Sequence, residues 1–175
     1  MDANQILTFV VRPTLRHLDP EIPISRAAER VVLLTAAHES SGFRYIDQLS
    51  NDPARPGPAY GLWQMEAATL ADHWAWLRAR DGDGHLVRPA LLAKIEELLA
   101  PWPTLPLQLH GNLYLACAMA RVHYRRAPEP LPDDLDGVAH LWKVRYNTVD
   151  GKGTEAEFKA NARRAGWPFD AVEAT

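Results

Sequence analysis

Apolar residues recur every three or four positions along most of the chain, which is the spacing of amphipathic α-helices. This pattern predicts helices that carry Ala67, Leu70, Trp74 and Leu77, then Leu91, Ile95 and Leu98, then residues 112–126, and then Leu135, Val138 and Trp142. Strand signals are weak, because no sustained alternation of β-branched and polar residues occurs. The sequence therefore predicts one mostly α domain over residues 1–175.

Two further helices are expected near the ends of the chain. One lies near residues 3–18, although Pro13 interrupts it. The other begins at Thr154, because Glu157 follows three residues later in the pattern of a capping box. Prolines concentrate in stiff connections between these helices, at 52–58, 101–106 and 128–132.

One predicted helix places an acid among apolar residues. Ser25 is a favourable N-cap for a helix that runs to about Ser41, and Gly42 is its stop signal. Glu39 lies on the same stripe as core-facing residues such as Val32. Burial and the negative end of the helix dipole both disfavour a carboxylate, so we predict a raised pKa and a proton available near neutral pH. The alternative is that this side chain reaches solvent at a fraying helix end.

Composition narrows the classes of function. The 175 residues are 47% hydrophobic and 23% charged, which is typical of a globular protein. The net charge is −3, so no overall basic field attracts nucleic acid, anionic membranes or cell-wall polymers. Solvated helix faces explain the basic clusters at 121–126 and 143–145, so a DNA-binding module is disfavoured. A large substrate would have to be held in a shaped groove.

Cysteine content and the first residues bear on location. The single cysteine, Cys117, allows no intramolecular disulfide and suits folding in a reducing cytoplasm. The first residues are acidic, and a short apolar run is cut by Arg12 and Pro13, so we expect no signal peptide. No stretch approaches the roughly 20 apolar residues of a membrane span, so we expect no membrane insertion.

Metal binding is not indicated. The run HESSG at 38–42 lacks the second histidine of an H-E-x-x-H zinc motif. The run DGDG at 81–84 begins like a calcium loop, but Leu92 stands where a bidentate glutamate is required. We therefore predict a turn at 81–84, no metal and no cofactor.

Short motifs follow one another in a recognisable order. They are Glu39-Ser40 at the helix end, Gly61-Leu62-Trp63-Gln64-Met65 with Thr69, Asn112 at the start of a helix, and Tyr146-Asn147. In this order they resemble the signatures of the soluble lytic transglycosylases and goose-type lysozymes, over residues 28–150. The resemblance implies a lysozyme-like helical fold with a substrate groove, whose motif-bearing core spans about residues 25–150.

The resemblance implies that Glu39 is the only essential catalytic carboxyl. It would protonate the glycosidic oxygen between N-acetylmuramic acid and N-acetylglucosamine in peptidoglycan, and then act as a base. In the transglycosylases the base deprotonates the sugar's own 6-hydroxyl, which closes a 1,6-anhydro ring; in the lysozymes it activates water. We predict the transglycosylase outcome. Hydrolysis is the alternative, and Asp47, Asp52 and Glu66 are its candidates for a second carboxylate.

The resemblance also places residues of the first two motifs in a substrate site. Ser40 is expected to form structural hydrogen bonds there and not to act as a nucleophile, since no histidine is placed to activate it. Gly61 would let the backbone approach sugar, and Gln64 offers a donor and an acceptor. Tyr60 and Trp63 offer flat faces for sugar rings, although Trp63 suits a core position equally well.

The last motif would complete the site. Tyr146 is expected to hydrogen-bond Glu39 and orient it, while Asn147 holds the loop or contacts sugar. The expected partners are peptidoglycan glycan strands, and the chain is expected to be a monomer.

The setting suggested by the sequence is a phage lysis enzyme (endolysin) or a virion-associated wall-degrading protein. Such an enzyme is made in the cytoplasm without an export signal. It reaches the wall through a holin-type pore or from outside. The alternative from another class is a non-catalytic peptidoglycan-binding or virion structural protein.

Overall fold

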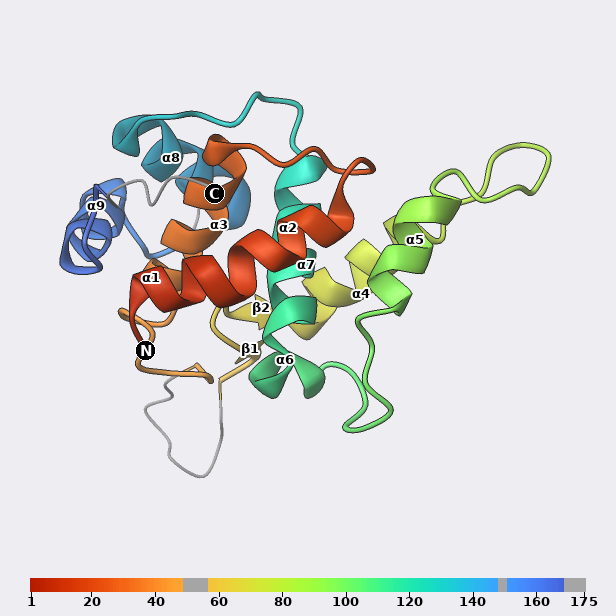
Figure 1. Cartoon of the computed structure of the whole chain (residues 1–175), viewed down its shortest axis with the longest axis horizontal. Coiled ribbons are helices and arrows are strands. Elements are labelled where there is room, and N and C mark those ends of the chain that lie inside the picture. Colours follow the sequence, from red (N-terminus) through yellow and green to blue (C-terminus); the bar gives the residue numbers. More distant parts are fainter. Residues whose placement is uncertain (49–56, 148–150, 169–175) are drawn as a thin grey trace.

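The periodic apolar segments fold as helices in the computed structural model, which describes residues 1–48, 57–147 and 151–168. This part of the chain is mostly helical, with one short antiparallel hairpin. The elements are α1 (Ala3–Ile6), η1 (Leu7–Val11), α2 (Arg12–Leu18), α3 (Arg26–Glu39), β1 (Ala59–Tyr60), β2 (Met65–Glu66), α4 (Ala67–Leu77), α5 (Pro89–Glu96), α6 (Gln108–Gly111), α7 (Leu113–Arg125), α8 (Leu135–Leu141), η2 (Trp142–Tyr146) and α9 (Glu155–Arg164). The predicted mostly α class is confirmed (Figure 1).

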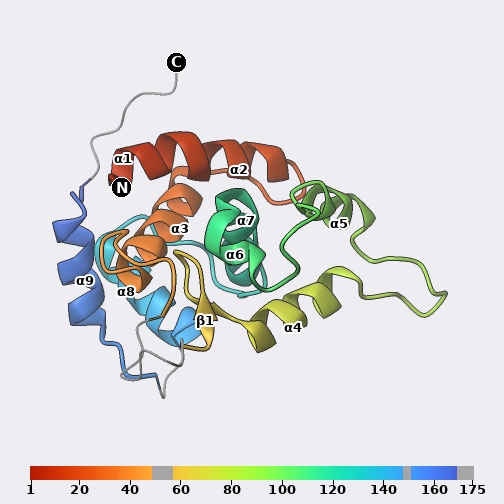
Figure 2. The same ribbon diagram turned by 90° about the horizontal axis from the view of Figure 1, so that it is seen from below.

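Helix α3 is enclosed by the rest of the protein. Every residue from 31 to 37 is buried. Val32 and Leu33 belong to a large apolar cluster with α1, α2, α4, α5 and α7, whereas Val31 and Leu34 belong to a smaller one with α8, η2 and α9. Figure 2 shows α1 and α2 on one side of α3, and α8 and α9 on its other sides. The last residue of α3 therefore emerges between the two clusters.

The ends of α3 follow local rules. The Ser25 hydroxyl accepts a backbone N–H of the first turn, as its N-cap position predicts. The helix ends at Glu39, slightly earlier than predicted, because the next residues leave the helical region of backbone space. Ser41, Gly42 and Phe43 have φ values of 52°, 78° and 63°. This left-handed run turns the chain sharply away from the helix axis.

The N-terminal helix near residues 3–18 is confirmed as α1, η1 and α2 in succession. The middle segment is a π-helical turn, in which the Arg12 N–H bonds the Leu7 carbonyl. Pro13 follows at the start of α2. Its ring would crowd a regular α-helix, and the wider π turn accommodates it.

The remaining predicted helices also form. Thr154 and Glu157 make both hydrogen bonds of the predicted capping box at the start of α9. Residues 81–84 form the predicted turn, in which Asp81 Oδ1 accepts the backbone N–H groups of Asp83 and His85. Among the residues described, none of the helices has the length and apolar character needed to cross a bilayer.

The hairpin was not predicted, because each strand has only two residues. Ala59 pairs with Glu66, and Tyr60 pairs with Met65. Gly61 turns the chain with a φ of 75°, and a Cβ at this position would lie 2.1 Å from the Leu109 carbonyl oxygen. The glycine is therefore needed for close approach to α6, and the prediction that it approaches sugar is corrected.

We expect Gly61→Ala to lower the free energy of unfolding by about 1–3 kcal/mol, because the new methyl group meets backbone and the φ is left-handed. Urea denaturation measures the loss. Gly82→Ala is the matched control, since a Cβ there has no atom within 4 Å. Equal stability of the two variants would contradict this account of the turn.

Candidate active site

The carboxyl group of Glu39 is held by an indole. The Trp142 Nε1–H donates to Glu39 Oε1 at 2.7 Å. Glu39 ends α3, whose residues belong to both apolar clusters, and Trp142 begins η2 and belongs to the smaller cluster, so this hydrogen bond ties the end of α3 to η2.

Burial raises the pKa of Glu39 to about 7, and the hydrogen bond from Trp142 opposes this rise. The residue as a whole is partly exposed, but protein surrounds its carboxyl group closely enough for desolvation to dominate. The raised pKa predicted from the helical stripe is thus supported. A pKa in this range allows Glu39 to release and regain a proton near neutral pH.

Aromatic packing fixes the ring of Trp142. Its centroid lies 4.3 Å from that of His38 in an edge arrangement and 5.0 Å from that of Phe158. Burial lowers the pKa of His38 to about 4, so this ring is neutral at pH 7. The Asn161 side-chain amide donates to its Nδ1 at 2.8 Å. Helix α9 thereby supports both Trp142 and the residue before Glu39.

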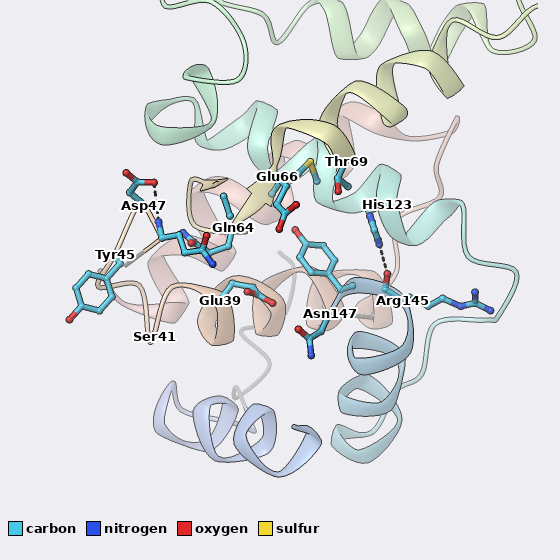
Figure 3. A pocket seen from close by; sticks show the side chains of 14 residues that line it. Glu39, Ser41, Tyr45, Asp47, Gln64, Glu66, Thr69, His123, Arg145 and Asn147 are labelled. Carbon is cyan, nitrogen blue, oxygen red and sulfur yellow. Dashed lines mark hydrogen bonds between the residues drawn. The ribbon is translucent and has the colours of Figure 1, made fainter. Parts of the chain in front are cut away.

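Glu39 faces a pocket with a volume of about 600 Å³. Figure 3 shows its walls, which come from the end of α3, the following loop, the hairpin, α4, α7 and η2. The lining residues are Glu39, Ser41, Tyr45, Asp47, Gln48, Ala59, Gln64, Met65, Glu66, Thr69, His123, Arg145, Tyr146 and Asn147.

Two further carboxylates line the pocket. In Figure 3, Glu66 enters from the hairpin side and Glu39 from the helix opposite. The carboxylate of Glu66 forms no hydrogen bond or ion pair with described residues, whereas Asp47 accepts the Gln48 N–H and lies 3.5 Å from His110 Nε2. Asp52, the remaining candidate, lies outside the described residues.

Gln64 and Asn147 line the pocket, and each also braces a loop. The Gln64 amide nitrogen donates to the Gly61 carbonyl at 2.7 Å, which leaves its amide oxygen as a possible acceptor for a ligand. Its backbone φ is 47°, unusual for a residue with a side chain. The Asn147 amide donates to the Gly153 carbonyl at 3.1 Å, which agrees with the loop-holding role considered for it.

Tyr146 lines the pocket but does not hold Glu39 as predicted. Its hydroxyl donates to the Trp63 carbonyl at 2.7 Å. Burial, and then the charge of Glu39, raise the pKa of Tyr146 above its usual range, so the two side chains are electrostatic neighbours. Trp142 takes the orienting role that the sequence assigned to the tyrosine.

Other predicted sugar contacts are absent from the pocket lining. Ser40 is fully buried; its hydroxyl accepts the Phe43 N–H and donates to a backbone carbonyl, so its role is structural. Trp63 is 1% exposed and donates to the Val32 carbonyl at 2.9 Å, which makes it a core residue. The Tyr60 ring packs on His110, with centroids 5.2 Å apart. Gly61 is buried against Leu109, as described above.

Sequence reasoning missed Trp142 and His123 as site residues. Trp142 follows the apolar spacing of its helix, so it resembled any other core residue. His123 lies within a helix of small apolar residues, and no motif marks it. The spacing between Trp142 and Tyr146 was an available signal, because residues four apart share a helix face.

Among the residues that the structure describes, one group of potential metal ligands lies outside the pocket. The ligating atoms of Asp81, Asp83 and His85 all fall within 4.8 Å of one another, on an exposed turn. Asp81 already accepts backbone N–H groups of that turn. The cluster therefore has a structural explanation.

We expect Trp142→Phe to raise the pKa of Glu39 above its wild-type value, because the one hydrogen bond that stabilises the anion among the described residues is lost. Carbon-13 NMR titration of the Glu39 carboxyl measures the change. Trp102→Phe is the control, since Trp102 is 82% exposed. A pKa that stays constant or falls would show that the indole does not hold the carboxylate.

Glu39→Gln should stabilise the protein in alkaline solution. The folded pKa, about 7, exceeds the ordinary 4.5, so wild type loses stability as pH rises between these values. The variant avoids this cost, by on the order of 3 kcal/mol at pH 8, and gains nothing at pH 4. Denaturation at both pH values tests this, with Glu66→Gln as a control for an exposed pocket carboxylate. An equal effect at both pH values would exclude burial of the charge as the cause.

Comparisons with known proteins found no matching family model, no similar curated protein and no similar solved structure.

Proposed function

We propose that this chain cleaves the β-1,4 bond between N-acetylmuramic acid and N-acetylglucosamine in peptidoglycan, with Glu39 as its acid and base. The observation that carries the proposal is the buried Glu39 carboxyl, whose pKa is raised to about 7 at the wall of a large pocket. A carboxylic acid in this range is suited to protonating a leaving group at neutral pH and to taking a proton back.

The proposed reaction begins with Glu39 protonated. Its proton passes to the glycosidic oxygen as the bond from that oxygen to the sugar C1 breaks, which leaves Glu39 as a carboxylate. The carboxylate then removes the proton of the 6-hydroxyl on the same muramic acid residue, and the 6-oxygen bonds to C1. The products are a 1,6-anhydro end and a free 4-hydroxyl, and Glu39 is protonated again.

The proposal includes a lysozyme-like fold in which the pocket is part of a glycan groove. The volume of about 600 Å³ and the polar side chains of its lining support this, because sugars need hydrogen-bonding partners. Gln64 and Asn147 are the proposed sugar contacts that remain from the motifs. Ser40, Tyr60, Gly61 and Trp63 are not proposed as contacts.

Hydrolysis is the second candidate, and Glu66 favours it. This carboxylate lines the pocket with Glu39 and has no partner among the described residues. A second carboxylate that positions water is the usual feature of inverting glycosidases. The setting we propose, for either outcome, is a phage lysis enzyme or virion-associated protein.

Purified cell walls test the proposal. Wild type should lower their turbidity, and Glu39→Gln should lower the rate by about 100-fold or more, because general acid catalysis is lost. Glu66→Gln is the matched control: it should keep activity if the 6-hydroxyl attacks and lose it if water attacks. Mass spectrometry of the products separates anhydro ends from reducing ends. Failure of wild type to clear the walls, or full activity of Glu39→Gln, would refute the proposal.

A further inference from the structure

A chain of hydrogen bonds runs along one flank of the pocket. Arg126 Nη1 lies 2.7 Å from His73 Nδ1, and His73 Nε2 lies 3.1 Å from His123 Nδ1. His123 Nε2 in turn lies 2.6 Å from the Arg145 carbonyl oxygen. These hydrogen bonds connect α4, α7 and η2, and His123 lines the pocket that contains Glu39. Figure 3 shows the last of these contacts, between His123 and Arg145.

The chemistry of the two ends fixes the direction of every hydrogen bond. A guanidinium only donates, so His73 Nδ1 must accept and its hydrogen must lie on Nε2. That hydrogen is donated to Nδ1 of His123, whose own hydrogen must then lie on Nε2. A carbonyl oxygen only accepts, which agrees with donation from His123 to Arg145. Both rings are thereby held neutral in the same tautomer.

The surrounding charges agree with two neutral rings. Burial is the main cause that lowers the pKa of His73, to about 3, and of His123, and the positive charge of Arg126 acts in the same direction. Asp72 on α4 opposes this, but it is an exposed residue that Arg126 already binds at 2.5 Å. On the side of η2, the Arg145 guanidinium is paired with Glu129, and the Tyr146 ring lies 4.8 Å from His123.

An added proton on either histidine would break this series of hydrogen bonds. It would have to enter at Nδ1 of either ring, where it would face the N–H of the preceding donor. A charged pair of rings, in contact at 5.0 Å and beside Arg126, would also repel. The arrangement therefore exists only while both histidines are neutral.

The carbonyl at the end of this chain belongs to the segment that builds the site. Arg145 lies in η2, whose first residue, Trp142, donates to Glu39 and whose last residue, Tyr146, lines the pocket. Tyr146 is also fixed through its hydroxyl on the Trp63 carbonyl. Hence η2 is held at its start by Glu39 and near its end by His123.

We propose that His123 is a positioning residue which, oriented by His73 and Arg126, holds η2 so that Trp142 and Tyr146 keep their places beside Glu39. The effect of His123 on catalysis rests on the proposed function, whereas its effect on the position of η2 does not. Since the folded state keeps both rings neutral, the stability that the hydrogen bonds add is complete above the ordinary histidine pKa of 6.5 and decreases as pH falls below it, in the case of His73 toward its lowered pKa of about 3.

Nitrogen-15 NMR of the histidine rings tests the chain without any substrate. His73 and His123 should both carry hydrogen on Nε2 alone at pH 7, and His73 should remain neutral at pH 5. Hydrogen on Nδ1 of either ring at pH 7, or a protonated His73 at pH 5, would overturn the proposal.

Paired substitutions test the positioning role. His123→Leu removes both hydrogen bonds, whereas His123→Gln keeps an acceptor and a donor. We expect the leucine variant to shift the Trp142 indole N–H resonance and to lower kcat on soluble glycan strands by about tenfold, with little change in KM. The glutamine variant should restore most of both. His140→Leu, which removes an exposed histidine paired with Glu155, is the control.

The outcomes separate the two proposals. If wild type has no activity, the proposed function fails, and the ring nitrogens and the Trp142 resonance still decide the positioning role. If His123→Leu does not fold, His73→Leu and His73→Gln repeat the comparison one link further from the pocket. An unchanged Trp142 resonance in a folded leucine variant, or a glutamine variant no better than leucine, would overturn the inference.

Discussion

The hydrogen bond between Trp142 and Glu39 is the interaction on which the pocket depends. A carboxyl group withdrawn from water needs a partner, and among the described residues a single indole N–H is the partner that it receives. One donor is enough to hold the group in place but not enough to reverse the effect of burial, so the pKa stays near 7. Several backbone N–H donors would have fixed the group as an anion. The balance between burial and one hydrogen bond keeps this acid able to gain and lose a proton.

The position of α3 explains how the protein brings these groups together. Because this helix is shared by two apolar clusters, its C-terminal end opens where the clusters meet. The left-handed run after it leads the chain away and leaves space beside the carboxyl group. The hairpin and η2 then close that space from two sides. The hairpin lies close to the Leu109 carbonyl at Gly61, and η2 is held by the Arg145 carbonyl, which accepts a hydrogen bond from His123.

The features that could be predicted from the sequence are those that depend on residues close together in the chain. Apolar spacing located the helices, and Ser25 and Thr154 marked helix starts, because both cap bonds join residues only a few positions apart. The place of Glu39 on a buried stripe followed from the same spacing. Partners distant in the chain were not predictable: Trp142 and Glu39 are 103 positions apart, and a tryptophan at apolar spacing gives no sign of what its N–H meets. Trp63 is a second example: an aromatic ring can pack on a sugar or in a core, and the sequence did not show that Trp63 is a core residue that donates to the Val32 carbonyl.

The π-helical turn of η2 bears on how this part of the chain tolerates a change in length. Such a turn holds one residue more than a turn of α-helix but completes about the same rotation. Deleting one residue within the segment would therefore restore ordinary helical winding and leave the residues beyond it facing nearly the same way. The apolar contacts of α8 would survive, and Tyr146 would still point toward the pocket. A one-codon deletion is thus a genetic change that this segment can absorb, whereas the same deletion in an ordinary α-helix would rotate the residues beyond it by about 100°.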